Sequence, residues 1–186
     1  LHFGLIYRKQ FAEKLKRSSA IAYISEFAKQ DTHAHFEVPN IPEYVIYNGN
    51  TITDISIPTD YKPSLLPPKP YLSSIGDFSD RKNFMSLVEM LRFLPEYNLV
   101  LSGSNSSSYA EKLTEKVKQY GFENRVFQTG KIADLEKQYY LQNCESFVFP
   151  SLREGFGIPP IEAMRAQSFN WKTTAEKYIE VYKSLL

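Results

Sequence analysis

Short apolar runs alternate regularly with helical stretches in the second half of this chain, a pattern that few folds accommodate. Apolar residues recur at helical spacing between the runs, as in the stretch from Phe84 to Leu91. The runs themselves have the length of buried strands and occupy residues 71–75, 98–101, 125–128 and 146–149. Strands that alternate with helices pair in parallel through right-handed crossovers. The sequence therefore predicts an α/β fold with a Rossmann-like, doubly wound parallel sheet.

The same pattern indicates where functional residues gather. In an open parallel sheet, ligands bind beyond the carboxyl ends of the strands. Each predicted strand ends there in a small or polar turn. These turns start at Gly76, Ser102, Thr129 and Pro150. We expect the candidate chemistry on this edge of the sheet.

The first half of the chain is organised differently. Its pattern predicts a helix, a strand, a second helix capped by Ser25, and a strand that ends at the turn Asn48-Gly49. These elements cover residues 5–16, 20–24, 26–36 and 43–47.

Five prolines between Ile57 and Pro70 form a stretch that is too rigid for helix or sheet, so we place a domain boundary there. The predicted parts are residues 1–56 as the remnant of a first domain, 57–70 as a Pro-rich linker, 71–167 as the main domain and 168–186 as a final helix.

Composition excludes several classes of partner. The chain has 186 residues, and its 22 Lys and Arg against 21 Asp and Glu leave a net charge of +1, so no global field favours nucleic acid. Its 13 Tyr and 13 Phe are scattered without a basic stripe, which also argues against nucleic acid. The sequence has no spanning apolar run and no signal-like start, so we expect a cytoplasmic protein.

Metal, disulfide and serine-hydrolase chemistry have no support in the sequence. It contains no Asp-x-Asp, and His2, His33 and His35 do not combine with carboxylates in a metal-ligand spacing. We expect no bound metal. Cys144 is the single cysteine, which we predict to be a packed thiol. The serine cluster from Ser102 lacks the nucleophile elbow Gly-x-Ser-x-Gly.

Two cations, Arg81 and Lys82, follow the first predicted strand and stand at the predicted start of a helix. Cations are poorly placed at the positive end of a helix, and a bound phosphate would remove the conflict. The alternative is a solvated surface pair. Their place on the ligand-binding edge favours an anion site.

Two glutamates, Glu154 and Glu162, lie eight positions apart across a Gly-Phe-Gly turn. Pro159 and Pro160 suit a first helical turn, and Glu162 in that turn can accept bonds from the vicinal hydroxyls of a ribose. Glu162 can equally be only a favourable charge near a helix start. A dinucleotide fingerprint would need glycine where Pro160 stands, so an NAD site is disfavoured.

Together, the segments around these residues resemble family 4 of the retaining glycosyltransferases. The resemblance covers residues 71–167 and is carried by 76–83, 98–103, 125–130 and 149–157. It implies a GT-B fold, with two facing Rossmann-like domains, that is incomplete in this chain. Compared with the family's pattern, nearly all of the acceptor-side domain and a segment after Gln167 would be absent from this chain.

The resemblance implies an enzyme that transfers a sugar, with retention of configuration, from a nucleotide diphosphate donor of the GDP-mannose or UDP-hexose type. The acceptor would be a glycan or a lipid-linked sugar, and neither cofactor nor metal would be needed. By position, the catalytic residues would be Glu154, Arg81 and Lys82. The donor would be bound by Arg81, Lys82, Ile132, Gly155, Phe156, Gly157, Ile158 and Glu162.

Within this resemblance, Glu162 would hold the ribose, Glu154 would lie against the donor sugar, and the main chain of Ile132 would meet the base. The chain departs from many relatives at Asp77, where they have arginine. Two alternatives stay open: a module that binds a nucleotide sugar without transferring it, and an unrelated nucleotide-binding protein. The basic helix from Arg8 to Arg17 either contacts the inner membrane face peripherally or is a solvated helix face.

Overall fold

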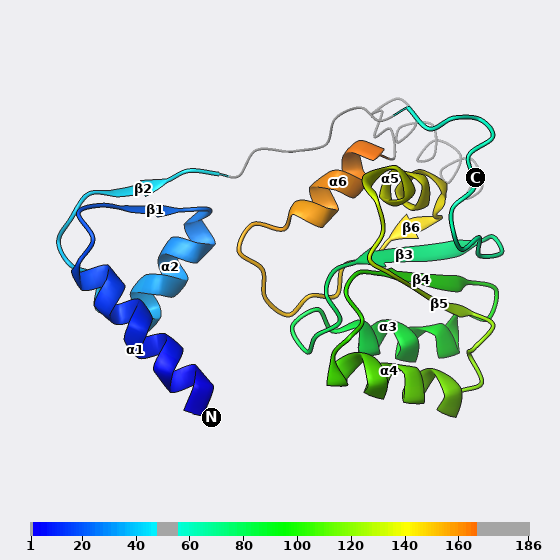
Figure 1. Ribbon diagram of the computed structural model, residues 1–186, viewed down its shortest axis with the longest axis horizontal. Coiled ribbons are helices and arrows are strands. Elements are labelled where there is room, and N and C mark those ends of the chain that lie inside the picture. The colour runs from blue at the N-terminus through cyan, green and yellow to red at the C-terminus, as the bar shows by residue number, and fades with distance from the viewer. Residues whose placement is uncertain (1, 48–55, 167–186) are drawn as a thin grey trace, which may run out of the picture. The chain divides into compact units, whose positions relative to one another are not determined.

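A computed structural model of the chain describes residues 2–47 and 56–166 (Figure 1). By their contacts, these residues form two compact units. The first comprises residues 2–47 together with 154–157, and the second comprises 56–153 together with 158–166. The predicted turn at Asn48-Gly49 and the predicted final helix 168–186 lie outside the described residues.

The first unit has two helices and two short strands, in the predicted order. The elements are α1 (His2–Lys16), β1 (Ile21–Tyr23), α2 (Glu26–His35) and β2 (Glu43–Val45). The two strands pair in parallel, and both helices lie on the same side of them (Figure 1). The predicted cap is confirmed, because the Ser25 hydroxyl accepts a hydrogen bond of 3.0 Å from the Ala28 amide.

The second unit contains a four-stranded parallel sheet. Its strands are β3 (Tyr71–Ile75), β4 (Asn98–Ser102), β5 (Val126–Gly130) and β6 (Ser146–Phe147), in the spatial order β5-β4-β3-β6. Its helices are α3 (Phe84–Met90), with the short 3-10 helix η1 (Leu91–Phe93), then α4 (Ser108–Gln119), α5 (Asp134–Asn143) and α6 (Ile158–Ala166). Helices α3 and α4 cover one face of the sheet, and α5 and α6 cover the other (Figure 1). The predicted doubly wound parallel sheet is confirmed.

Alternation along the strands builds a core on each face of this sheet. Successive side chains of a strand point to opposite faces. In β4, Leu99 and Leu101 pack in the cluster that includes residues of α3 and α4, whereas Val100 packs in the cluster that includes Tyr140 of α5. Cys144 belongs to this second cluster and is 8% exposed, so the prediction of a packed thiol is confirmed.

Two strands differ in length from the apolar runs that predicted them. Strand β6 has only two residues instead of four. Among the described residues it pairs with β3, and two residues after Val148 the chain reaches Pro150, which has no amide hydrogen to donate to a ladder. Strand β5 continues beyond the predicted Gln128 to Gly130. A shift in the register between β4 and β5 brings Gly130 opposite Ser102. Pairing with a neighbour, rather than apolar composition, sets these ends.

The Pro-rich segment is packed on the second unit. Residues 57–70 contain neither helix nor strand, as the prolines predict. One carboxylate oxygen of Glu136 in α5 accepts hydrogen bonds from the Ser64 amide at 2.8 Å and from the Ser64 hydroxyl at 2.6 Å. The hydroxyl of Tyr140, also in α5, donates to the carbonyl of Leu65 at 2.5 Å. Helix α5 therefore holds this segment in place.

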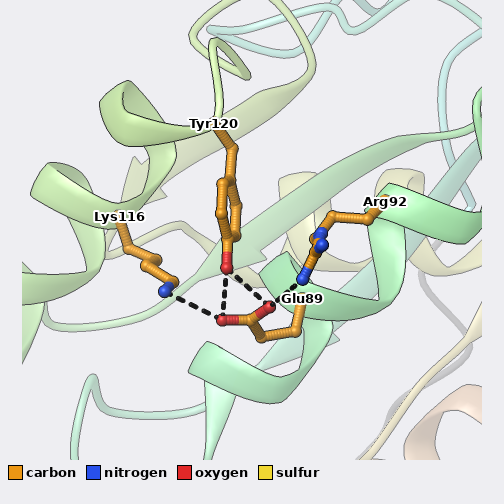
Figure 2. A network of polar contacts seen from close by, with 4 residues as sticks. All are labelled: Glu89, Arg92, Lys116 and Tyr120. Carbon is orange, nitrogen blue, oxygen red and sulfur yellow. Dashed lines mark hydrogen bonds and ion pairs between the residues drawn. The ribbon is translucent and has the colours of Figure 1, made fainter.

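A polar network links α3 and η1 to α4 (Figure 2). The Tyr120 hydroxyl lies 2.7 Å from both carboxylate oxygens of Glu89, and Lys116 and Arg92 lie 3.0 and 3.3 Å from that carboxylate. The hydrogen bond from Tyr120 is the main cause that lowers the pKa of Glu89, and Lys116 adds to it.

None of the helices within residues 2–47 and 56–166 is long and apolar enough to cross a membrane.

Candidate functional site

Glycines stand at the carboxyl ends of three neighbouring strands. The amide of Gly76, after β3, donates to Ser102 at 2.9 Å, and the amide of Gly103, after β4, donates to Gly130 at 2.8 Å. Gly103 has φ +142°, and a Cβ there would lie 2.0 Å from the carbonyl oxygen of Gly76. Only glycine fits this position. The backbones therefore approach closely at this edge.

A cavity of about 430 Å³ opens at this edge. It lies where the strand pattern placed the candidate chemistry. Four of its lining side chains are cationic and two are carboxylates, so the charge of the lining favours an anionic ligand. The lining residues are Ile75, Gly76, Asp77, Arg81, Lys82, Ser102, Gly103, Ser104, Lys131, Ile132, Asp134 and Lys137.

Lys82 is a buried cation of this cavity. The residue is 6% exposed, and its ammonium lies 4.8 Å from the centre of the Phe149 ring. Its aliphatic stem passes over Gly76, where a Cβ would lie only 2.8 Å from the Lys82 Cε. The alternative of a solvated surface pair is therefore wrong for Lys82. The glycine is what allows the stem to cross the strand end.

Arg81 lines the same cavity but is exposed. Its guanidinium donates to the carbonyl of Arg153 at 3.1 Å, and its own carbonyl accepts from the Leu152 amide at 2.9 Å. We predicted that both cations stand at the start of a helix, but α3 begins only at Phe84. The reason is Asn83, whose left-handed φ of 54° interrupts helical geometry. The cations belong to the turn that precedes α3.

Glu162 lies in the second turn of α6, so its predicted place in the first turn is wrong. Helix α6 begins at Ile158, and Pro159 and Pro160 do occupy its first turn, as predicted. Glu162 is 6% exposed, and its Oε1 lies 2.9 Å from the ammonium of Lys137. It is not among the residues that line the cavity, whereas Lys137 is.

Lys137 lies between two carboxylates, because Asp134 Oδ1 is 3.0 Å from its ammonium. Burial by itself would lower the pKa of Lys137. The hydrogen bonds and charges of Glu162 and Asp134 outweigh that effect, so the pKa of Lys137 lies above its ordinary value. This lysine stays protonated at neutral pH.

Sequence reasoning missed several lining residues, among them Lys131, Asp134 and Lys137. For Lys137 a signal was present, since it is the fourth residue of α5 and a cation near a helix N-terminus is unfavourable without a carboxylate partner. Ile132 was predicted, and it lines the cavity. Its predicted contact with a base stays a prediction.

The residues predicted to touch the donor sugar are divided between the units. Glu154, Gly155, Phe156 and Gly157 belong to the first unit, where the Ser25 hydroxyl donates to the Gly155 carbonyl and the Phe156 ring lies 5.8 Å from that of Tyr47. Ile158 is the first residue of α6 in the second unit. Their predicted roles at the sugar stay predictions.

Within residues 2–47 and 56–166, no group of three or more His, Cys, Asp or Glu side chains is arranged to hold a metal ion. The expectation that no metal is needed stays a prediction.

The fold and the basic cavity define a class of protein, the GT-B type, of which the second unit is a partial Rossmann-like domain. Solved structures share this fold. Anabaena HepE, in complex with UDP and glucose, superposes with a TM-score of 0.69 at 19% identity, over 89% of this chain and 47% of that one. TarM superposes with a TM-score of 0.62 at 20% identity, over 85% and 30%.

Within this class, the chain belongs to the family of glycosyl transferases group 1, which it matches over residues 58–168. It is 27% identical to the serotype-specific mannosyltransferase WbdA of Escherichia coli, with 88% of this chain and 22% of WbdA covered. It is also 27% identical to the O-antigen chain mannosyltransferase B of Escherichia coli, with 84% and 43% covered. The chain thus spans less than half the length of these relatives.

Proposed function

We propose that this chain is the donor-binding part of a retaining, metal-independent glycosyltransferase of family 4. The enzyme moves a sugar from a nucleoside diphosphate sugar to a glycan or lipid-linked acceptor and uses no cofactor. The observation that carries the proposal is Lys82, a buried ammonium in the wall of a cavity at the carboxyl edge of a parallel sheet. Its position beyond the carboxyl ends of the strands and its positive charge both fit a phosphate ligand.

Lys82 and Arg81 place two positive charges in the wall of the cavity, and such a wall attracts a phosphate group. The Phe149 ring lies beside the Lys82 ammonium, 4.8 Å from it, and adds a cation–π contact. A diphosphate in the cavity would supply full negative charge to Lys82 and to Arg81. Both cations would then stabilise the diphosphate as it leaves the sugar, which is electrostatic catalysis.

The other predicted residues complete the proposal. Glu162 binds the ribose hydroxyls, the main chain of Ile132 meets the base, and Glu154 acts at the reacting sugar, with the backbone from Gly155 to Ile158 beside it. The resemblance in sequence supports these roles.

We propose GDP-mannose as the first donor to test, because WbdA and the O-antigen chain relative are named as mannosyltransferases. A UDP-hexose is the second, because the HepE structure holds UDP and glucose. The names of the relatives also motivate an acceptor of the O-antigen or lipopolysaccharide type. The enzyme would then work in the cytoplasm at the inner membrane face, where the exposed basic residues of α1 would make a peripheral contact.

Calorimetric titration of the full chain with GDP, GDP-mannose, UDP and UDP-glucose tests the proposal. Since a bond to a charged group contributes about 1.5–3 kcal/mol, Lys82→Ala should weaken binding of the preferred nucleotide roughly tenfold or more. Lys118→Ala is the matched control, because Lys118 is an exposed lysine of α4 outside the cavity lining. Equal affinities of wild type, Lys82→Ala and Glu162→Ala would contradict the proposal. Repeating the titration in EDTA tests metal independence.

A second candidate is a module that binds a nucleotide sugar without transferring it. The observation that favours this function is that every residue of the cavity lining comes from the second unit. Mannose transfer by the full chain would contradict the second candidate, whereas binding without transfer agrees with both, because the first candidate assigns only the donor-binding part to this chain.

A further inference from the structure

Lys137 is a cation of the cavity with an unusual setting. It lies in the first turn of α5, where the helix dipole disfavours positive charge. The carboxylate of Asp134 offsets this only weakly, because its side chain is 78% exposed and solvent screens the pair. The carboxylate of Glu162 is 8% exposed and lies 2.9 Å away, so it is the stronger partner.

Glu162 needs this partner as much as Lys137 does. A carboxylate that is withdrawn from water is stable only with a cation or several hydrogen-bond donors nearby. The pair is also held rigidly, because Leu141 of α5 packs against Ala163 and Ala166 of α6 beside it. The two charged groups therefore have a fixed geometry, and of the two only Lys137 lines the cavity.

We infer that Lys137 is a positioning residue for Glu162 and that the pair recognises the ribose of the bound nucleotide as one unit. The inference rests on the proposed function. A carboxylate has about four acceptor positions on its two oxygens. The ammonium of Lys137 occupies one at Oε1 and restrains the orientation of the group. The other acceptor positions are left for the vicinal hydroxyls of a ribose, and loss of the ammonium frees the carboxylate to turn away.

A purely structural role is the competing explanation, in which the pair only joins α5 to α6. The two explanations differ in how ligand binding responds. Loss of a residue that only joins the two helices should change the affinities for all ligands by the same factor. Loss of a positioning residue should lower only the affinities for ligands that carry ribose hydroxyls. The decisive quantity is the ratio of affinities for a ribonucleotide and for its 2′,3′-dideoxy counterpart.

The experiment is calorimetric titration of the full chain with GDP and UDP, with their 2′,3′-dideoxy counterparts and with pyrophosphate. Lys137→Met should lower the ratio of affinities about tenfold, the loss expected for a hydrogen bond to a charged group. Lys131→Met is the matched control, because Lys131 lines the same cavity. It should lower the affinities for all these ligands by one factor and leave the ratio unchanged. Lys137→Arg should retain most of the ratio.

A double variant completes the test. If Lys137 acts through Glu162, Lys137→Met combined with Glu162→Gln should lower the ratio no further than Glu162→Gln alone. Retained binding of pyrophosphate shows that each variant is folded. A wild-type ratio in Lys137→Met would overturn the inference while the proposed function stands. A wild type that binds neither GDP nor UDP would overturn the proposed function and the inference with it.

Discussion

Replacing Gly103 by alanine should destabilise the second unit strongly. Gly103 follows β4 at the cavity edge, with φ +142°, and the new Cβ would lie 2.0 Å from the Gly76 carbonyl oxygen and 2.6 Å from its carbon. Both contacts are with backbone, so no flexible side chain can move aside. The backbone after β3 or β4 must shift instead.

The magnitude follows from two costs and one gain. Overpacking costs about 1–3 kcal/mol, and a φ that only glycine adopts readily costs about 1–3 kcal/mol. Alanine recovers about 0.4–1 kcal/mol by restricting the unfolded chain. We expect a net loss of about 3 kcal/mol in the free energy of unfolding, which is more than a hundredfold in the folding equilibrium.

Urea unfolding at neutral pH, followed by circular dichroism, measures this loss. Gly121→Ala is the matched control, because Gly121 also has a positive φ, of 68°, but a Cβ there would meet nothing within 4 Å. The control should lose only the free energy that the positive φ costs, about 1 kcal/mol. If the two variants lose the same free energy, the close approach of the strand ends does not determine the need for glycine at position 103, and the reasoning fails.

Two further predictions concern the same unit. Arg125→Met should lower the free energy of unfolding in urea by about 2 kcal/mol, because the guanidinium donates to three carbonyl groups of the segment between α3 and β4; a loss within error would refute this. Tyr120→Phe should raise the pKa of Glu89, measured by NMR titration of its carboxyl carbon, because the tyrosine hydroxyl is the main group that lowers it. Because the pKa of Glu89 is lowered in the folded state, the ionised carboxylate stabilises the fold at pH values above its ordinary pKa of 4.5. This stabilisation is lost as the pH falls through the folded-state pKa, so the difference in stability between Tyr120→Phe and wild type should shrink in acid. An unchanged pKa of Glu89 would show that the contact with Tyr120 does not stabilise the ionised carboxylate, which would refute this prediction.

Local information determined most of the elements of this protein. The strand Tyr71–Ile75 agrees with its apolar run residue for residue, and the helix that starts after Ser25 begins where its cap predicted. Helical spacing likewise found the buried face of α3, which includes Phe84, Leu87 and Val88. Periodicity and capping depend on residues close in sequence, so they can be recognised without the fold. The order of strands and helices then limits the topology to a doubly wound parallel sheet.

Features that depend on distant residues were not visible in the sequence. The length of β6 depends on pairing with β3, and the end of β5 depends on a register shift opposite β4. Asn83, with its positive φ, moved the start of α3 beyond the two cations. Such details follow from the geometry of neighbours that the chain meets only when folded.

The candidate site divides in the same way. The sequence by itself showed that cations and glycines follow the strands, and hence on which edge of the sheet an anion site is to be expected. Only the tertiary structure decided that Lys82 is buried over Gly76 and that Glu162 pairs with Lys137. The physical reason is that burial and charge pairing are properties of space. Lys137 and Glu162 lie 25 residues apart on two helices, and only the packing of α5 against α6 brings their charges within 2.9 Å.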